Sequence, residues 1–242
     1  MSKKERETSR AARAAAVRQQ QASQERRRRI IITAAVLAVL AIIVGAGVLL
    51  GGGGDDPSAG DSKVDARADG QALVLGTSPD APKVVVYEDF LCPYCREFEA
   101  ASRDTLRDAA RRGDAVVEYR PFRLLPDDYS LTALTAWAAV LEGGTGAQAL
   151  EFHNLLFENQ PYEAATDKPG IDDLVDLAGE AGVTDDDVLA AMREPHQEFV
   201  DAADANAREA GIEGTPTVLV DGEKLTGAPS EMADQLEERL AP

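Results

Sequence analysis

Residues 83–99 read KVVVYEDFLCPYCREFE, and this stretch decides how the chain folds. The run from Val84 to Tyr87 is apolar and rich in β-branched residues, which is typical of a central strand buried on both faces. The strand ends just before Cys92 and Cys95, the only two cysteines in the 242 residues. We expect a helix to follow and to end at Gly113. Its predicted inner face consists of Phe98, Ala101, Leu106 and Ala109.

The Cys-Pro-Tyr-Cys spacing suits thiol chemistry. Two cysteines three residues apart at a helix start lie near disulfide distance. The helix dipole and unpaired backbone N–H groups stabilise a thiolate at Cys92. Cys95, one turn further in and more buried, can resolve a mixed disulfide formed by that thiolate. Pro93 fits the first turn of a helix, where its missing N–H costs little. The pattern therefore favours a redox-active pair.

Two other uses of the cysteines are weaker. A structural disulfide that closes so short a loop restrains the unfolded chain little. A zinc site needs four ligands, and only His153 and His196 could add nitrogens. These histidines have no paired spacing and are interpreted as ordinary helix residues. We therefore predict no metal and no other cofactor.

The elements around this stretch predict an α/β fold. Short strands are expected at residues 72–76 and 115–122, and the region 127–211 has helical periodicity. Within it, Leu131, Leu134, Ala138 and Leu141 form one stripe, and Thr145 with Gln148 has capping-box spacing. A hairpin with an Asp221-Gly222 turn and a final helix capped by Ser230 complete the chain. The helical region is interpreted as an insertion into one domain at residues 71–242.

The N-terminal part predicts a membrane anchor. Residues 30–50 are uncharged with one polar side chain, and about 20 such residues span a bilayer. Arg26 to Arg29 precede them, so residues 1–29 are expected in the cytoplasm and the domain outside. Residues 51–70 are rich in Gly, Asp and Ser and are predicted to be a flexible linker. A long signal peptide cleaved near Ala46-Gly47 is the alternative.

Charge divides the chain in the same way. Residues 1–29 carry about +7, the whole chain −18, and the remainder about −25. An acidic body repels phosphates, so nucleic acid is excluded as a partner.

Three segments together carry a family resemblance. These are LGTSPDAPKVVVYEDFLCPYC (residues 75–95), the helical insertion, and GIEGTPTVLVDGEKLTG (residues 211–227). From about residue 71 onward the chain resembles DsbA-like thiol-disulfide oxidoreductases. The resemblance implies a thioredoxin-like fold with an inserted helical domain, an active-site pair at Cys92 and Cys95, and a substrate-binding cis-proline loop at Thr215-Pro216. The residues by themselves leave cis and trans open at this bond, although X-Pro bonds tolerate cis.

Two features depart from the family pattern. Many relatives carry a buried acid six residues before the first cysteine, where this chain has Val86. Glu88, at the end of the strand, is the candidate proton acceptor for Cys95, and the alternative is that Glu88 and Asp89 are solvated. The middle pair, Pro93-Tyr94, lacks the histidine of strongly oxidising members, so we expect a weaker oxidant.

The expected function is a single-pass, membrane-tethered oxidoreductase outside the cytoplasm, where disulfides persist. It would pass its disulfide to exported cysteine-containing polypeptides and be reoxidised by a quinone-linked membrane partner. We expect a monomer, since residues 51–70 are too short and polar for an added dimerisation domain. A reductase or isomerase, a peptide-binding chaperone, and a module with an inert disulfide are the alternatives.

Overall fold

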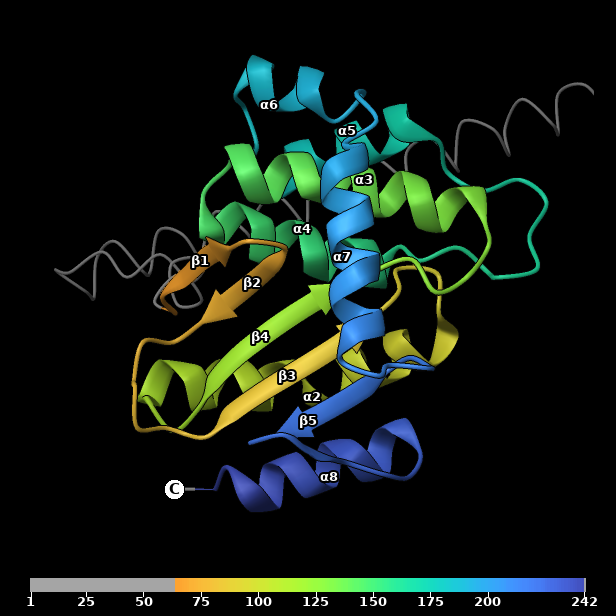
Figure 1. Ribbon diagram of the computed structural model, residues 1–242. Coiled ribbons are helices and arrows are strands. Elements are labelled where there is room, and N and C mark those ends of the chain that lie inside the picture. The colour runs from red at the N-terminus through yellow and green to blue at the C-terminus, as the bar shows by residue number, and fades with distance from the viewer. Residues whose placement is uncertain (1–63, 242) are drawn as a thin grey trace, which may run out of the picture. The chain divides into compact units, whose positions relative to one another are not determined.

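The computed structural model describes residues 64–241 (Figure 1). The predicted tail at 1–29, the predicted membrane span at 30–50 and the linker up to residue 63 lie outside the described residues. Among the helices that are described, none is long and apolar enough to cross a membrane.

The described residues form one mixed sheet in the strand order β1-β2-β4-β3-β5-β6. β3 and β4 run parallel, and the other neighbouring strands are antiparallel. β3 is therefore central. Val84 and Val86 are fully buried on one face and Tyr87 is buried on the other, as predicted, whereas Val85 is only half-buried. The strands are β1 (Ala66–Asp69), β2 (Ala72–Leu75), β3 (Lys83–Glu88), β4 (Val116–Pro121), β5 (Thr217–Val220) and β6 (Glu223–Lys224).

Within residues 64–241, two helices belong to the sheet domain and five to the insertion. α2 (Pro93–Arg112) follows β3 and packs against α8 (Pro229–Arg239). Figure 1 shows the carboxyl ends of β3 and β4 pointing toward the insertion, whose helices lie within the predicted range 127–211. These helices are α3 (Asp128–Gly143), α4 (Gly146–Glu158), α5 (Ile171–Glu180), α6 (Asp186–Ala191) and α7 (Gln197–Glu209).

Several local predictions are confirmed. The Thr145 hydroxyl accepts from the Gln148 N–H at 3.2 Å, and the Gln148 side chain accepts from the Thr145 N–H at 2.8 Å. β5 and β6 form the expected hairpin, with Asp221 and Gly222 at φ 50° and 85° in its two-residue turn. Gly113 ends α2 in the left-handed conformation at φ 82°.

The linker prediction is wrong for residues 66–69, which form β1. This strand pairs with β2 in register from Ala66 opposite Leu75 to Asp69 opposite Ala72. It is mostly exposed, so its order comes from backbone pairing rather than from burial. An apolar pattern could not have indicated it.

Three helix details also differ from the prediction. On α2, Ala101 is exposed, whereas the polar residues Glu99 and Ser102 are buried. α3 is buried over most of its surface because α4, α5, α6 and α7 surround it, so Leu131 is not part of a single inner stripe. α8 begins at Pro229 after Ala228, whose N–H donates to the Glu231 carboxylate at 2.8 Å, so Ser230 is not its cap.

We predict that Gly146→Ala destabilises the protein by about 1–3 kcal/mol, because overpacking a close contact has this cost. A Cβ at Gly146 would lie 1.8 Å from the backbone oxygen of Ala66 in β1. Gly179→Ala is the matched control, since its Cβ would meet nothing within 4 Å. Chemical denaturation of both variants measures the difference. Equal free energies of unfolding for the two variants would show that β1 can move away from the added methyl group without loss of stability.

Candidate active site

Cys92 occupies the N-cap position of α2. Its backbone is extended, with φ −69° and ψ 118°, and Pro93 takes the first helical position as predicted. The Cys92 carbonyl accepts from the N–H groups of Cys95 at 3.1 Å and Arg96 at 3.3 Å, which starts the helix. The positive end of the helix dipole therefore lies at the first cysteine.

The two thiols differ in exposure. Both are in the reduced state, and Cys92 is 6% exposed whereas Cys95 is 0% exposed. A partner sulfur from solvent can therefore approach Cys92 and not Cys95. This is the asymmetry expected of an attacking and a resolving cysteine.

The Thr215-Pro216 peptide bond is cis and lies beside the cysteines. β5 pairs with β3 through Thr217 opposite Tyr87, and this pairing places the loop before β5 at the start of α2. The Cys92 Sγ lies 3.4 Å from the Thr215 carbonyl oxygen, to which it donates a hydrogen bond when it is protonated. The structure thus brings together the four residues that the sequence analysis singled out first.

The pKa values of the two cysteines move in opposite directions. The Cys95 thiol, which donates to the Cys92 sulfur, lowers the pKa of Cys92 to about 6. The Thr215 side chain and the backbone N–H groups of Cys95 and Tyr94 act in the same direction, against burial. Burial raises the pKa of Cys95 well above its ordinary value, and its contact with Cys92 adds to this. Near neutral pH, Cys92 is a thiolate and Cys95 a thiol.

A groove of about 460 Å³ borders this pair. Its lining includes Tyr94, which is 59% exposed, and Thr215 and Pro216 of the cis-proline loop. The beginning of α8 also lines the groove, with the apolar side chain of Met232. An extended peptide could lie here next to the Thr215 backbone.

Asp89 is buried and has a structural role, so the solvated alternative is wrong for this residue. Its carboxylate accepts from the Leu91 N–H at 2.8 Å, within the active-site loop. It also accepts from the N–H groups of Leu124 and Leu125 at 2.9 Å and from the Ser130 hydroxyl at 2.6 Å. This one carboxylate ties the active-site loop to the segment that leads into the insertion.

Gln160 also holds the active-site loop, a role that was not predicted from the sequence. Its side-chain amide donates to the carbonyls of Phe90 and Cys92, both at 3.0 Å. Gln160 follows α4, so the insertion contributes directly to the geometry of the cysteine loop. A single glutamine in a helix-to-helix connection carries no sequence signal for such a role.

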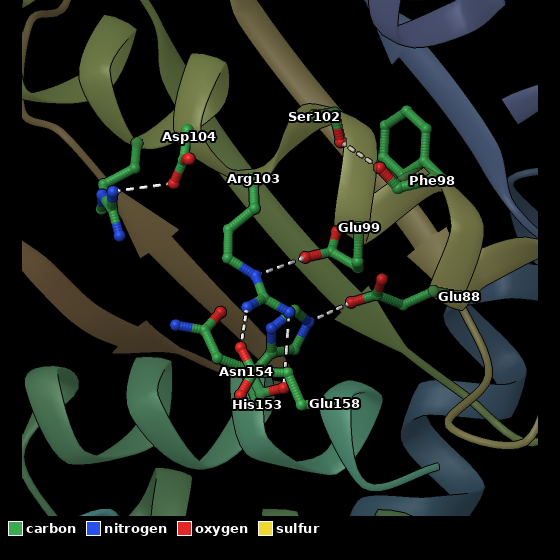
Figure 2. Close-up of polar contacts among 10 residues, drawn as sticks. Glu88, Phe98, Glu99, Ser102, Arg103, Asp104, His153, Asn154 and Glu158 are labelled. Carbon is green, nitrogen blue, oxygen red and sulfur yellow. Dashed lines mark hydrogen bonds and ion pairs between the residues drawn. The ribbon is translucent and has the colours of Figure 1, made fainter. Parts of the chain in front are cut away.

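Glu88 is fully buried, so the solvated alternative is wrong here too. Its Oε1 lies 2.5 Å from Nε2 of His153, which is also fully buried (Figure 2). The interpretation of His153 as an ordinary helix residue is therefore wrong, whereas His196 stands at the N-cap position of α7 without a side-chain capping hydrogen bond. Burial raises the pKa of Glu88 well above its usual range. Glu99 and Arg103 on α2 complete this cluster, and neither was predicted.

The comparisons with known proteins agree with this geometry. A family model described as Thioredoxin matches residues 69–238. No curated protein matches the chain in sequence. Among solved structures, the chain is similar to the MdbA protein, a thiol-disulfide oxidoreductase from Corynebacterium diphtheriae. That match has 26% identity and a TM-score of 0.62, and covers 72% of this chain and 93% of that one.

Two further structures are similar. DsbA from Mycobacterium tuberculosis in its reduced form shares 27% identity with a TM-score of 0.60, over 72% of this chain and 94% of that chain. BdbD from Bacillus subtilis, with 20% identity and a TM-score of 0.61, shares the fold over 75% of this chain and all of its own. The fold and the site thus define a DsbA-like thiol-disulfide oxidoreductase. The chain belongs to the thioredoxin family, as the sequence motifs predicted.

We predict that Cys95→Ala raises the pKa of Cys92, because the Cys95 thiol is the largest cause of its low value. The ultraviolet absorbance of the thiolate, followed against pH, measures this for the reduced protein. The wild type is expected to titrate near pH 6 and the variant clearly higher. An unchanged titration would mean that the helix end, and not Cys95, stabilises the thiolate.

Proposed function

We propose that this thiol-disulfide oxidoreductase works outside the cytoplasmic membrane and passes the Cys92–Cys95 disulfide to exported cysteine-containing polypeptides. The observation that carries the proposal is the contrast between the two thiols. Cys92 is reachable and acidic, whereas Cys95 is enclosed and has a raised pKa. A stable Cys92 thiolate favours the reduced form, and a readily reduced disulfide oxidises its partners.

The transfer takes two exchange steps. A substrate thiolate attacks the Cys92 sulfur, the enzyme disulfide breaks, and Cys95 leaves as a thiolate that takes up a proton. A second substrate thiolate then attacks the substrate sulfur of the mixed disulfide, and Cys92 leaves as a thiolate. Its low pKa makes Cys92 the better leaving group. The substrate gains a disulfide, and the enzyme keeps two electrons as a dithiol.

Substrate binding is assigned to Thr215, Pro216 and Tyr94. An extended segment in the groove would pair with the Thr215 backbone and lay its side chains on Tyr94 and Pro216. Glu88 supports the chemistry as the group that exchanges a proton with Cys95, since the charge of Glu88 acts on the Cys95 thiol. Pro93 supports it by starting α2 directly after Cys92.

The proposal places the domain outside the cytoplasm on a single-pass anchor at residues 30–50, with residues 1–29 inside. The uncharged stretch and the preceding arginines support this orientation. A tethered enzyme would stay near a quinone-linked membrane partner that removes its two electrons. The active form is proposed to be a monomer.

The direction of transfer is tested by the reduction potential of the full-length protein in glutathione buffers. We expect a reduction potential of about −180 mV, which is typical of oxidants and isomerases. The pKa of Cys92 lies between two reference values for this fold, about 3.5 for DsbA and about 7 for thioredoxin. This supports an oxidant that is weaker than DsbA and stronger than thioredoxin. A value near about −270 mV would instead identify a reductase.

The need for thiol chemistry is tested by Cys92→Ser with a reduced, unfolded substrate protein. We expect this variant to lose disulfide formation entirely, because the attacking thiolate is gone. Met232→Ala, in the wall of the groove, should keep the chemistry and weaken substrate binding. Full assistance of refolding by Cys92→Ser would identify a chaperone and contradict the proposal.

A further inference from the structure

A cluster of ionisable side chains lies buried beside the cysteines (Figure 2). Glu88 comes from the end of β3, Glu99 and Arg103 from α2, and His153 from α4 in the insertion. Glu88, Glu99 and His153 each have 0% exposure, and one ligand-type atom from each lies within 4.8 Å of the others. Three separate elements therefore bring two carboxyl groups and an imidazole to one enclosed point.

The cluster has fewer hydrogen bonds than its polar atoms require. One bond joins His153 Nε2 to Glu88 Oε1. Among residues 64–241, Glu88 Oε2, both oxygens of Glu99 and His153 Nδ1 have no hydrogen-bond partner. Burial without partners disfavours the charged form of a carboxyl group, so protonation is the simplest relief. Asp89, in contrast, is buried with four donors.

The charges around the cluster favour one proton on its carboxyl groups. The guanidinium of Arg103 lies with its Nε 3.8 Å from Glu99 Oε2 and also pairs with the half-exposed carboxylate of Glu158. Burial lowers the pKa of His153 to about 4, so the imidazole is neutral. Burial raises the pKa of Glu99 to about 7, and the nearby Glu88 carboxylate adds to it. Since Glu158 already pairs with Arg103, the guanidinium offsets little of the buried charge, and one proton on Glu88 or Glu99 removes the repulsion between the two buried carboxylates.

The cluster is coupled to the cysteines through Glu88. The charge of Cys92 raises the pKa of Glu88, and the charge of Glu88 raises the pKa of Cys95. Other polar groups face the cluster from the surrounding elements. They are Asp89 after β3, Arg107 on α2, Tyr119 on β4, and Asn154 and Glu158 on α4. Tyr119 is neutral, because burial raises its pKa well above the usual value.

We propose that Glu88, Glu99 and His153 hold one proton as a unit, shared between the two carboxyl groups, and that this unit supplies Cys95. Glu99 and His153 are positioning residues for the reaction. His153 donates from Nε2 to Glu88 and stabilises its carboxylate, whereas the charge of Glu99 increases the proton affinity of Glu88. The inference rests on the proposed thiol-disulfide exchange, and it assigns the proton to the cluster rather than to Glu88 alone.

The proton balance follows the exchange step. When a substrate thiolate breaks the disulfide at Cys92, Cys95 leaves as a thiolate in an enclosed site. The shared proton moves to the Cys95 sulfur, and the cluster gains one negative charge that Arg103 faces. Solvent then returns a proton to the cluster. When the disulfide forms again, the cluster first releases its proton to solvent and then accepts the proton of Cys95 as its sulfur attacks.

The test is the equilibrium constant for reduction of the disulfide in the full-length protein by glutathione, measured from about pH 5.5 to 8.5. Above the pKa of Cys92 this constant should rise about tenfold per pH unit if no other group titrates. The Cys92 thiolate makes the cluster hold its proton to higher pH in the reduced form. We therefore expect a levelling around neutral pH in the wild type, meaning a pH range over which the equilibrium constant stops rising because the reduced form takes up a proton at the cluster.

Matched substitutions separate the shared proton from one held by Glu88 alone. Glu99→Gln should move the levelling to lower pH and restore the rise of about tenfold per unit above neutrality, since the negative charge of Glu99 no longer increases the proton affinity of Glu88. Glu97→Gln makes the same change on the exposed part of α2 and should reproduce the wild-type curve. A Glu99→Gln curve identical to wild type would overturn the proposal.

His153 is tested by two substitutions with opposite expectations. His153→Leu removes the donor to Glu88, so the levelling should move to higher pH. His153→Gln keeps a donor and should restore the wild-type position. Because Glu99→Gln and His153→Leu shift the curve in opposite directions, general loss of structure cannot produce both results. Identical curves for Leu and Gln would overturn the role of His153.

Two further results are distinguished. The same side chains could hold a divalent cation, since carboxylate and imidazole are its usual ligands. Elemental analysis of the purified protein that found one bound cation per chain would overturn the shared proton. The levelling does not depend on whether the protein is an oxidant or a reductase. A thioredoxin-like potential would therefore contradict the proposed direction and leave this inference standing.

Discussion

The contact between the Cys92 thiol and the Thr215 carbonyl joins positions 123 residues apart at 3.4 Å. It exists only because β5 returns to pair with β3 after the whole insertion has intervened. The ends of the insertion must therefore meet at the carboxyl edge of the sheet, where α2 begins. The attacking thiol, its neighbouring loop and the groove for a peptide all depend on this one strand pairing.

The insertion does more than cover the sheet. Gln160 holds the carbonyls of Phe90 and Cys92, and His153 contacts Glu88. Both residues come from or directly follow α4, and both act on the segment between β3 and α2. Here the geometry of the cysteine loop and the state of its buried acid are set from the inserted helices.

The buried carboxyl groups divide by how well they are satisfied. Asp89 accepts four hydrogen bonds, which stabilise its charged form and suit a purely structural tie. Glu88 accepts one hydrogen bond and Glu99 none, and the guanidinium of Arg103, 3.8 Å from Glu99, is also paired with Glu158. A site of this kind keeps a proton near neutral pH at some cost in stability. Such a cost is typical of functional positions, where a reactive group is kept even though its hydrogen bonds are incomplete.

The sequence by itself determined the local features of this protein. The β-branched run, the Cys-x-x-Cys spacing and the turn at Asp221-Gly222 each depend on near neighbours, so the central strand, the helix start and the hairpin were predictable. The motifs also indicated the family and the residues Thr215 and Pro216. Only the tertiary structure decided that Glu88 is buried, that His153 and Glu99 meet it, and that residues 66–69 form an edge strand. These features depend on which segments pack together. The sequence does not show whether a polar side chain will be surrounded by water or by protein.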